Sequence, residues 1–304
     1  REQGADVVFA EFHRAFVVFG EDAGGECGFS FLQREDFFFD GAGHHQLVDE
    51  HRLGLAEAVG AVGGLVFDGR IPPRIEVDHG IGGGETKNII IKDCDVSFIG
   101  GAFQTHCGRY GNGIEFWNNA SDCLVEGCSV GECFDTGMSN QSRTDGVVQR
   151  NIFFRNNRIY NCEASYEVWG QGENCIMENI YFENNLLENS GGGWSGNEEN
   201  HYPWLWGCHI LMFRSAAKVK NMYFTGNTFK NARSLIIDTW GGEQLWNDLE
   251  KIVVDYNTYI QPENKDLILW TNDPKGTGYL STASDFERYQ KETGNDKHST
   301  LRFE

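Results

Sequence analysis

One asparagine-centred phrase recurs along the chain at nearly constant spacing, and this repeat limits the fold more than any other feature. It reads NIFFRNNRIYN from residue 151, NIYFENNLLEN from residue 179 and NMYFTGNTFKN from residue 221. The equivalent position is held in turn by Cys94, Cys128, Asn157, Asn185, Asn227 and Asn257. These residues are 34, 29, 28, 42 and 30 positions apart. A period in this range is typical of stacked-repeat architectures.

The residues within each copy indicate strands. Apolar and polar residues alternate over four to six positions, so Phe154 and Ile159, like Phe182 and Leu187, are expected on one face. No long amphipathic helix separates the copies, which excludes leucine-rich and alternating α/β folds. A second short strand is expected at 113–117, 136–141, 166–169, 209–214, 235–239 and 266–270.

Coils that contain only short strands and turns stack into a parallel β-helix, in which each coil contacts its neighbours. We therefore predict an all-β solenoid of about six coils over residues 86–272. Asn157, Asn185, Asn227 and Asn257 are expected to stack at one turn. The asparagine there tolerates a left-handed backbone and can bond the equivalent side chain one coil away.

The phrases GIEFWNN, NNRIYNC, YEVWGQG and FENNLLENSGGGWS resemble the right-handed parallel β-helix proteins of the pectate-lyase-like superfamily. The resemblance covers roughly residues 85–272. It implies a right-handed parallel β-helix that acts on or binds carbohydrate. The superfamily includes polysaccharide lyases, glycoside hydrolases, epimerases and non-catalytic phage and surface proteins, so the resemblance does not select one reaction.

The two ends differ from the repeats. Residues 1–85 contain no Asn, Lys, Thr, Tyr, Trp or Met, and this break in composition suggests either a cap over the first coil or an unrelated module. Residues 273–304 are expected to form a turn and a capping helix. Ser284 is the predicted N-cap of that helix, Gly294 its end, and Phe286 and Tyr289 its docking face.

Charge and composition restrict the partners. A net charge of −20 argues against nucleic acid and against acidic polymers, whereas eight Trp favour a neutral polysaccharide or oligosaccharide partner. No run of 18 apolar residues is present, so no membrane partner is expected. The chain begins at Arg1 without a signal-peptide pattern, from which we expect a processed or truncated N-terminus on a secreted or extracellular protein.

No cofactor or metal site is expected. The nine cysteines show no metal-binding pair-of-pairs, and the histidines at 44, 45, 51 and 79 lack ligand spacing. Cys94, Cys128 and Cys162 fall on repeat positions and are expected to be small buried side chains. In a secreted protein, a disulfide is possible among Cys123, Cys133, Cys175 and Cys208.

A Glu-x-Trp phrase occurs at 115–117 and again at 167–169, on strands expected two coils apart. The coil between them carries Gly-Met-Ser at 137–139. Side chains alternate along a strand, so the middle residue of each phrase should face the core and the Glu and Trp should face outward.

Glu115 and Glu167 are therefore expected to face a shared groove on either side of Gly137, with Asp135 beside them. Positions two coils apart are about 10 Å apart. Inverting glycosidases place an acid and a base carboxyl about 6.5–9.5 Å apart. The predicted catalytic residues are Glu115, Glu167 and Asp135, in a hydrolase that acts on a neutral polysaccharide.

The 42-residue spacing between Asn185 and Asn227 implies an insertion of about 14 residues, at 190–207, which is rich in aromatic residues. Insertions in solenoids often border the binding face, although such a loop can also simply pack on the coil. The predicted substrate contacts are Trp117, Trp169, Trp194, His201, His209, Arg214 and Asp238.

Two other functions remain open. A polysaccharide lyase would need a base such as Arg143 or Arg214 and, by the resemblance, several Asp ligands for calcium. No clustered Asp set is present, which places lyase chemistry second. A non-catalytic carbohydrate-binding or surface β-helix is the third possibility, in which outward Glu and Trp side chains only form a solvated face.

Overall fold

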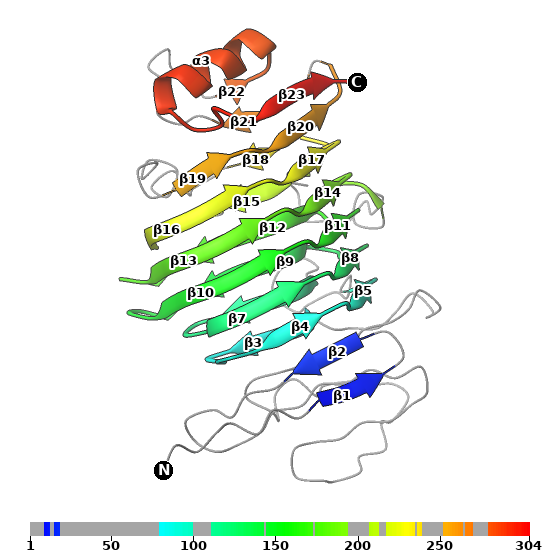
Figure 1. Cartoon of the computed structure of the whole chain (residues 1–304), viewed down its shortest axis with the longest axis vertical. Helices are drawn as coiled ribbons and strands as arrows, with labels where there is room; N and C mark the ends of the chain where they lie inside the picture. Colours follow the sequence, from blue (N-terminus) through cyan, green and yellow to red (C-terminus); the bar gives the residue numbers. More distant parts are fainter. Residues whose placement is uncertain are drawn as a thin grey trace, which may run out of the picture.

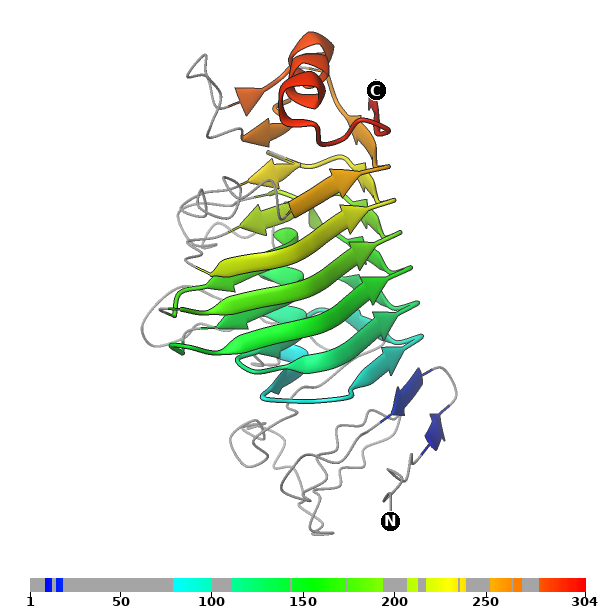
Figure 2. The ribbon, with the colours of Figure 1, turned by 60° about the vertical axis from the view of Figure 1, so that its left-hand side comes forward.

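Three sheets of short strands run side by side along the molecule (Figures 1 and 2). The computed structural model describes residues 9–12, 15–18, 79–99, 111–142, 144–172, 174–193, 207–212, 217–234, 236–238, 252–263, 265–269 and 279–304. The helix whose bounds lie within these residues is α3 (Ala283–Thr293), near the C-terminus.

We name the sheets A, B and C. Sheet A contains, in spatial order, β1 (Phe9–Phe12), β2 (Ala15–Val18), β4 (Ile90–Lys92), β7 (Ser121–Glu126), β10 (Val148–Arg155), β13 (Ile176–Glu183), β16 (Lys218–Thr225) and β19 (Ile252–Asp255). Sheet B contains β3 (His79–Gly84), β6 (Asn112–Trp117), β9 (Thr136–Ser142), β12 (Ala164–Gly170), β15 (Ile210–Met212), β18 (Ile237–Asp238), β21 (Ile268–Leu269) and β22 (Tyr279–Leu280). Sheet C contains β5 (Asp95–Ser97), β8 (Ser129–Gly131), β11 (Arg158–Tyr160), β14 (Leu186–Glu188), β17 (Thr228–Lys230), β20 (Thr258–Gln261) and β23 (Thr300–Phe303).

The chain winds through the sheets in the order A, C, B and then returns to A, as in β7, β8, β9 and β10. Each strand pairs in parallel with its equivalent one coil away; Ile152 of β10 lies opposite Ile180 of β13, for example. Antiparallel pairs occur at the two ends, between β1, β2 and β4 and between β21 and β22. The predicted β-helix-like solenoid of parallel strands is confirmed.

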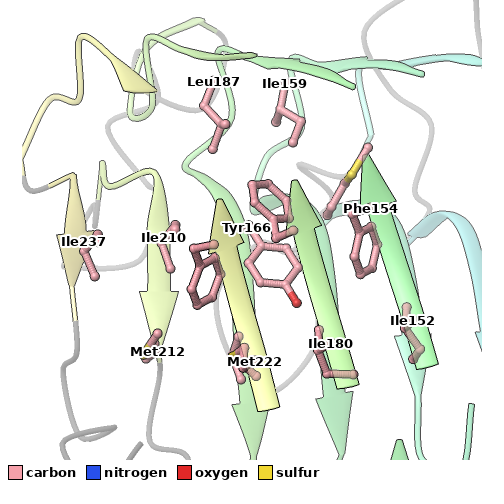
Figure 3. Packing of buried hydrophobic residues seen from close by; sticks show 14 of the residues in the cluster. Ile152, Phe154, Ile159, Tyr166, Ile180, Leu187, Ile210, Met212, Met222 and Ile237 are labelled. Carbon is pink, nitrogen blue, oxygen red and sulfur yellow. The ribbon is translucent and has the colours of Figure 1, made fainter. Parts of the chain in front are cut away.

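The core fills the space between the three sheets, because one side chain in two along each strand points inward. Phe154, Phe182 and Phe224 lie at the same level of successive coils, with ring centroids 6.3 and 6.1 Å apart. Figure 3 shows Ile152, Phe154, Ile159, Tyr166, Ile180, Leu187, Ile210, Met212, Met222 and Ile237 directed into this common interior. The inward face predicted from Phe154, Ile159, Phe182 and Leu187 is confirmed by their complete burial.

The predicted asparagine stack is also present. The backbone N–H of Asn157 donates to Oδ1 of Asn185 at 2.9 Å, and its Nδ2 donates to the same oxygen at 3.0 Å. Asn185 bonds Asn227 in the same way, and Asn227 bonds Asn257. At the N-terminal end of the series, the Cys128 N–H donates to Oδ1 of Asn157. Stacked amides thus satisfy buried backbone groups at this turn from Cys128 to Asn257.

The left-handed backbone, however, belongs to the residue before each stacked asparagine. Asn156 and Asn184 have φ values of 57° and 55°, whereas Asn157 and Asn185 do not have positive φ. The expectation that one asparagine performs both roles was wrong. The turn needs αL geometry at one residue and an inward amide at the next, so two residues share the roles: asparagine takes the αL position at 156 and 184, Gly226 takes it before Asn227, and Tyr256 takes it before Asn257.

The C-terminal cap contains α3 and β23. Thr282, rather than the predicted Ser284, is the N-cap of α3, because its hydroxyl accepts from the Asp285 N–H at 3.1 Å. The helix ends at Gly294 with φ 79°, as predicted. Phe286 docks on Tyr259 of the last coil, with ring centroids 5.5 Å apart. Figure 2 shows the helix lying across the end of the stack.

The cysteines of the repeat are buried, as predicted for Cys94, Cys128 and Cys162. Cys123, Cys133 and Cys175 are buried free thiols, so no disulfide joins them to one another. None of the helical residues in the described ranges forms a segment long and apolar enough to cross a membrane.

Candidate active site

The two Glu-x-Trp phrases lie in register on sheet B. Glu115 of β6 is opposite Ser139 of β9, and Ser139 is opposite Glu167 of β12. The two glutamates therefore stand at the same level, two strands apart. The residue between them is Ser139 and not the predicted Gly137.

The error at Gly137 has a steric explanation. A Cβ on Gly137 would collide with Cγ2 of Ile159, a core residue of β11. Gly137 therefore lies at the crowded corner where sheet B meets sheet C, and it leaves no space between the glutamates. Met138 still packs in the core, as predicted, because a shift of two residues along a strand leaves the facing of each side chain unchanged.

The side chains of Glu115 and Glu167 point away from the core, to the outer face of sheet B. Their neighbours Ile114, Phe116 and Val168 are buried in the apolar interior. Asn140, next to Ser139, points inward as well, since its amide oxygen accepts a hydrogen bond from the hydroxyl of Tyr166. Residues 115, 139 and 167 accordingly share the outer face, as the sequence predicts for both glutamates.

Glu115 is 0% exposed although it lies on the outer face. Its Oε2 accepts a hydrogen bond from Nδ2 of Asn112, on the same strand. Asn112 is oriented in turn by the backbone N–H of Thr136, which donates to its Oδ1 at 3.1 Å. The amide of Asn112, itself bonded to the neighbouring strand β9, thus holds the Glu115 carboxyl group in place.

Glu167 is 6% exposed and has two partners on β9. Nε2 of Gln141 donates to its Oε2 at 2.6 Å. The Thr136 hydroxyl lies 3.5 Å from the same oxygen and 3.3 Å from Oδ1 of Asp135. Thr136 therefore lies between the Asp135 and Glu167 carboxyl groups, so Asp135 is on the Glu167 side of the predicted pair.

The pKa of Glu167 is raised well above its usual value, first by burial and then by the negative charges of Asp135, Glu115 and Glu163. The hydrogen bond from Thr136 acts in the opposite direction and does not cancel these effects. Glu167 consequently holds a proton at pH values where an ordinary carboxyl has lost it.

Glu163 was missed in the sequence. It is 4% exposed and lies one residue before β12. Its contribution to the Glu167 pKa brings a fourth carboxyl group into the site. The Glu-x-x-x-Glu spacing of residues 163 and 167 was the available signal. Glu163 lies just before β12 and Glu167 within it, so strand alternation does not relate the directions of the two side chains.

The tryptophans Trp117 and Trp169 follow the glutamates on the same face, and both are partly exposed. Their rings contact each other, with centroids 6.1 Å apart and planes at 69°. The edge of one ring therefore meets the face of the other. Asp135 is partly exposed too, so the buried glutamates are bordered by accessible side chains at both ends of the strands.

His209 has a different environment from the one predicted. It is 0% exposed and just precedes β15. Nε2 lies 3.1 Å from the Lys230 carbonyl, to which it donates, while Nδ1 lies 2.7 Å from the Ser190 hydroxyl and 3.1 Å from that of Ser165. Burial lowers the pKa of His209 to about 3. It is thus a neutral interior group. The sequence predicted that His209 contacts the substrate, and its buried position does not favour such a contact.

The remaining predicted contacts fall elsewhere. Asp238 belongs to β18, where its backbone pairs with Leu211 of β15. Trp194, His201, Arg214 and the possible lyase base Arg143 lie outside the described residues, as do most of residues 1–85.

Comparisons with known proteins give no further assignment. No protein-family model, curated protein or solved structure matches this chain. Across the described parts of the chain, no three His, Cys, Asp or Glu side chains are grouped so as to hold a metal ion.

Proposed function

We propose that this protein is a glycoside hydrolase that cleaves a neutral polysaccharide, with Glu167 as general acid and Glu115 as general base. The observation that carries the proposal is the raised pKa of Glu167, in register with a second carboxyl on the same face. Acid–base hydrolysis requires two carboxyl groups whose environments keep one protonated while the other is ionised.

The spacing of the pair supports inversion. Two strand separations place the Cα atoms of Glu115 and Glu167 about 10 Å apart, and their carboxyl groups can lean closer. The inverting range of about 6.5–9.5 Å leaves room for a water molecule between the carboxyl groups. In the proposed step, Glu167 gives its proton to the glycosidic oxygen, and the bond from this oxygen to the anomeric carbon breaks. The water oxygen bonds to that carbon and Glu115 takes a proton from the water.

The charge of the chain and the two tryptophans beside the glutamates support a neutral substrate. A chain of net charge −20 repels anionic polymers, and the charges of Asp135, Glu115 and Glu163 beside Glu167 add to that repulsion locally. Trp117 and Trp169 offer apolar edges and faces to a sugar ring beside the pair. In the same proposal the solenoid is right-handed, as in the pectate-lyase-like superfamily, has about six coils, and belongs to a secreted protein.

The proposal also requires that a sugar can reach Glu115 and Glu167. Because Glu115 is 0% exposed, a sugar reaches it only after the groups that cover it have moved aside. Closure over the reacting bond would then exclude bulk water and strengthen the charge effects on Glu167.

The same burial favours a second candidate, a carbohydrate-binding or surface β-helix without catalysis. In that case Asn112, Gln141 and Thr136 only satisfy two structural carboxyl groups, and glycans bind at the partly exposed tryptophans.

Glu115→Gln and Glu167→Gln separate the two functions. With a panel of plant and microbial polysaccharides, we expect the wild type to release reducing ends, and each variant to lose at least about 100-fold in kcat while still binding the glycan. Glu183→Gln, on sheet A, is the matched control and should keep full activity. Binding by the wild type without any cleavage would establish the second candidate, and full activity of Glu167→Gln would exclude the proposed acid.

A further inference from the structure

Ser139 occupies the position between the two glutamates and has no partner there. Its side chain is 0% exposed. Among the residues that the structure describes, none forms a hydrogen bond with its Oγ. Gln141, two residues later on the same face, does have a partner in Glu167.

The direction of the Ser139 hydroxyl follows from its neighbours on β9. Gln141 extends to the Glu167 carboxyl on the outer face, and Asn140 extends to Tyr166 and Gln149 in the interior. Strand alternation then sends Ser139 to the outer face. Its register partners there are Glu115 and Glu167, so its hydroxyl faces the space between them.

A buried hydroxyl without a hydrogen bond is unfavourable, by about 1–3 kcal/mol. Most such groups in folded proteins are satisfied by protein or by ordered water. A bound water needs two to four polar partners, and the two carboxyl groups beside Ser139 supply them. The site is therefore suited to a small oxygen-containing molecule that binds the hydroxyl and at least one carboxyl at once.

We infer that the Ser139 hydroxyl holds the water molecule that attacks the substrate, between Glu115 and Glu167. The inference rests on the proposed hydrolase function and assigns Ser139 as a positioning residue for that reaction. One hydrogen of the water points to the Ser139 oxygen and the other to the Glu115 carboxylate. The lone pair of the water then points away from the sheet, where a sugar would lie.

Ser139 is unchanged by the step. The water oxygen bonds to the anomeric carbon, Glu115 receives one water proton, and the other hydrogen stays on the new hydroxyl of the product. The proton that the leaving oxygen needs comes from Glu167. Loss of Ser139 should therefore slow the chemical step without weakening the binding of the glycan.

The test combines a crystal structure with kinetics on Ser139→Ala. A matched control is Ser142→Ala, on the same strand and equally buried, whose hydroxyl already has neighbours in Asn118 and Thr144. At high resolution, the wild type should show a water within hydrogen-bonding distance of Ser139 Oγ and of a carboxyl oxygen of Glu115 or Glu167. Ser139→Ala should lack this water, lose about 10- to 100-fold in kcat, and keep KM and melting temperature.

The outcomes are distinguishable. An ordered structure with no water or ligand oxygen at Ser139 overturns the inference, whatever the activity. A water in place together with unchanged kcat in Ser139→Ala of an active enzyme overturns the positioning role. A wild type that cleaves no glycan refutes the proposed hydrolase and the catalytic role of Ser139 with it, while the water density still decides whether the binding site exists.

Discussion

At each turn between sheets A and C, two consecutive residues have separate tasks. Asn184 adopts the left-handed backbone, and Asn185 places its amide inside the coil. Asn185 accepts two hydrogen bonds from Asn157 and donates to the Phe154 carbonyl at 3.0 Å and to Asn227. A single buried side chain therefore satisfies groups on both adjoining coils.

Asn185→Ala should destabilise the protein by about 3 kcal/mol, because it leaves the Asn157 N–H and the Phe154 carbonyl buried without this partner. Chemical denaturation of the variant and the wild type measures the loss. Asn184→Gly is the matched control, since glycine adopts the φ of 55° freely, and it should change stability by less than about 1 kcal/mol. Equal losses in the two variants would contradict the division of tasks.

The sequence predicted the stack of amides because inward asparagines recur with the coil period. The Asn-Asn pairs at 156–157 and 184–185 do not show which residue has the αL backbone, since both types of position accept asparagine; Gly226, before Asn227, was the available signal. For the same kind of reason the sequence placed Gly137 where Ser139 stands. Both alignments direct Met138 inward, so only the pairing of β9 with its neighbours decides between them.

Strands β6, β9 and β12 form the element on which the candidate chemistry depends. Each contributes one polar residue to the same level of sheet B: Glu115, Ser139 and Glu167. The sequence predicted the shared face of the glutamates from alternation. Their burial depends on parts of the chain distant in sequence, about which a local pattern contains no information. Glu163 is close in sequence, but it precedes β12, where alternation does not predict the direction of a side chain.

Catalysis should depend on pH through Glu167. Its folded-state pKa is raised by burial and by the carboxylates of Asp135, Glu115 and Glu163, so the acid form persists above the usual carboxyl range. The kcat of the proposed reaction should fall as pH rises through that raised pKa, about tenfold per pH unit beyond it. A pH profile of kcat tests this, and an alkaline limb that stays unchanged in Asp135→Asn would contradict the role of the neighbouring charge.

The C-terminal cap contains a second buried carboxyl, Asp296. Burial raises its pKa to about 7, although hydrogen bonds from Ser299, Tyr259 and Asn257 act in the opposite direction. The Ser299 hydroxyl donates to Oδ1 at 2.6 Å and the Tyr259 hydroxyl at 2.9 Å. The cap thus closes the end of the asparagine stack around a group that titrates near neutral pH.

Stability should decrease as pH rises through about 7. The pKa of Asp296 is raised on folding, so its favourable contribution is complete below the usual aspartate pKa and is lost above the folded one. The change is at most about 4 kcal/mol between pH 4 and pH 8, by the shift of about three units. Denaturation at both pH values measures it, and Asp296→Asn should flatten the dependence. The same pH dependence of stability in the wild type and in Asp296→Asn would contradict this assignment.

Across the whole molecule, small thiols lie inside successive coils. Cys94, Cys128, Cys133 and Cys162 are 0–4% exposed, and burial raises the pKa of Cys123 to about 11. A thiol reacts as the thiolate and only where a reagent can reach it. Access therefore requires separation of the coils rather than local motion of a side chain.

These thiols should resist a thiol-reactive disulfide reagent for hours in the native protein and react within minutes in denaturant. Peptide mass spectrometry assigns the labelled residues, and it separates the coil thiols from the remaining cysteines of the chain. Rapid native labelling of Cys128 or Cys162 would show that the coils open on their own. That result would also weaken the use of sheet B as a rigid frame for the candidate site.

The asparagine stack has a direction, like a polymer whose two chain ends differ. Every backbone N–H of the stack donates toward the C-terminal coil. Asn157 therefore offers an acceptor to the Cys128 N–H, and the Asn257 N–H needs an acceptor beyond it, which is the Ser299 hydroxyl at 2.8 Å. The two ends keep these requirements whatever number of units lies between them. A gene that gained or lost one 28-residue unit, such as the stretch from Asn157 to Asn185, would still meet the same two termini. The length of this solenoid is therefore free to vary by whole coils, while its caps cannot be exchanged.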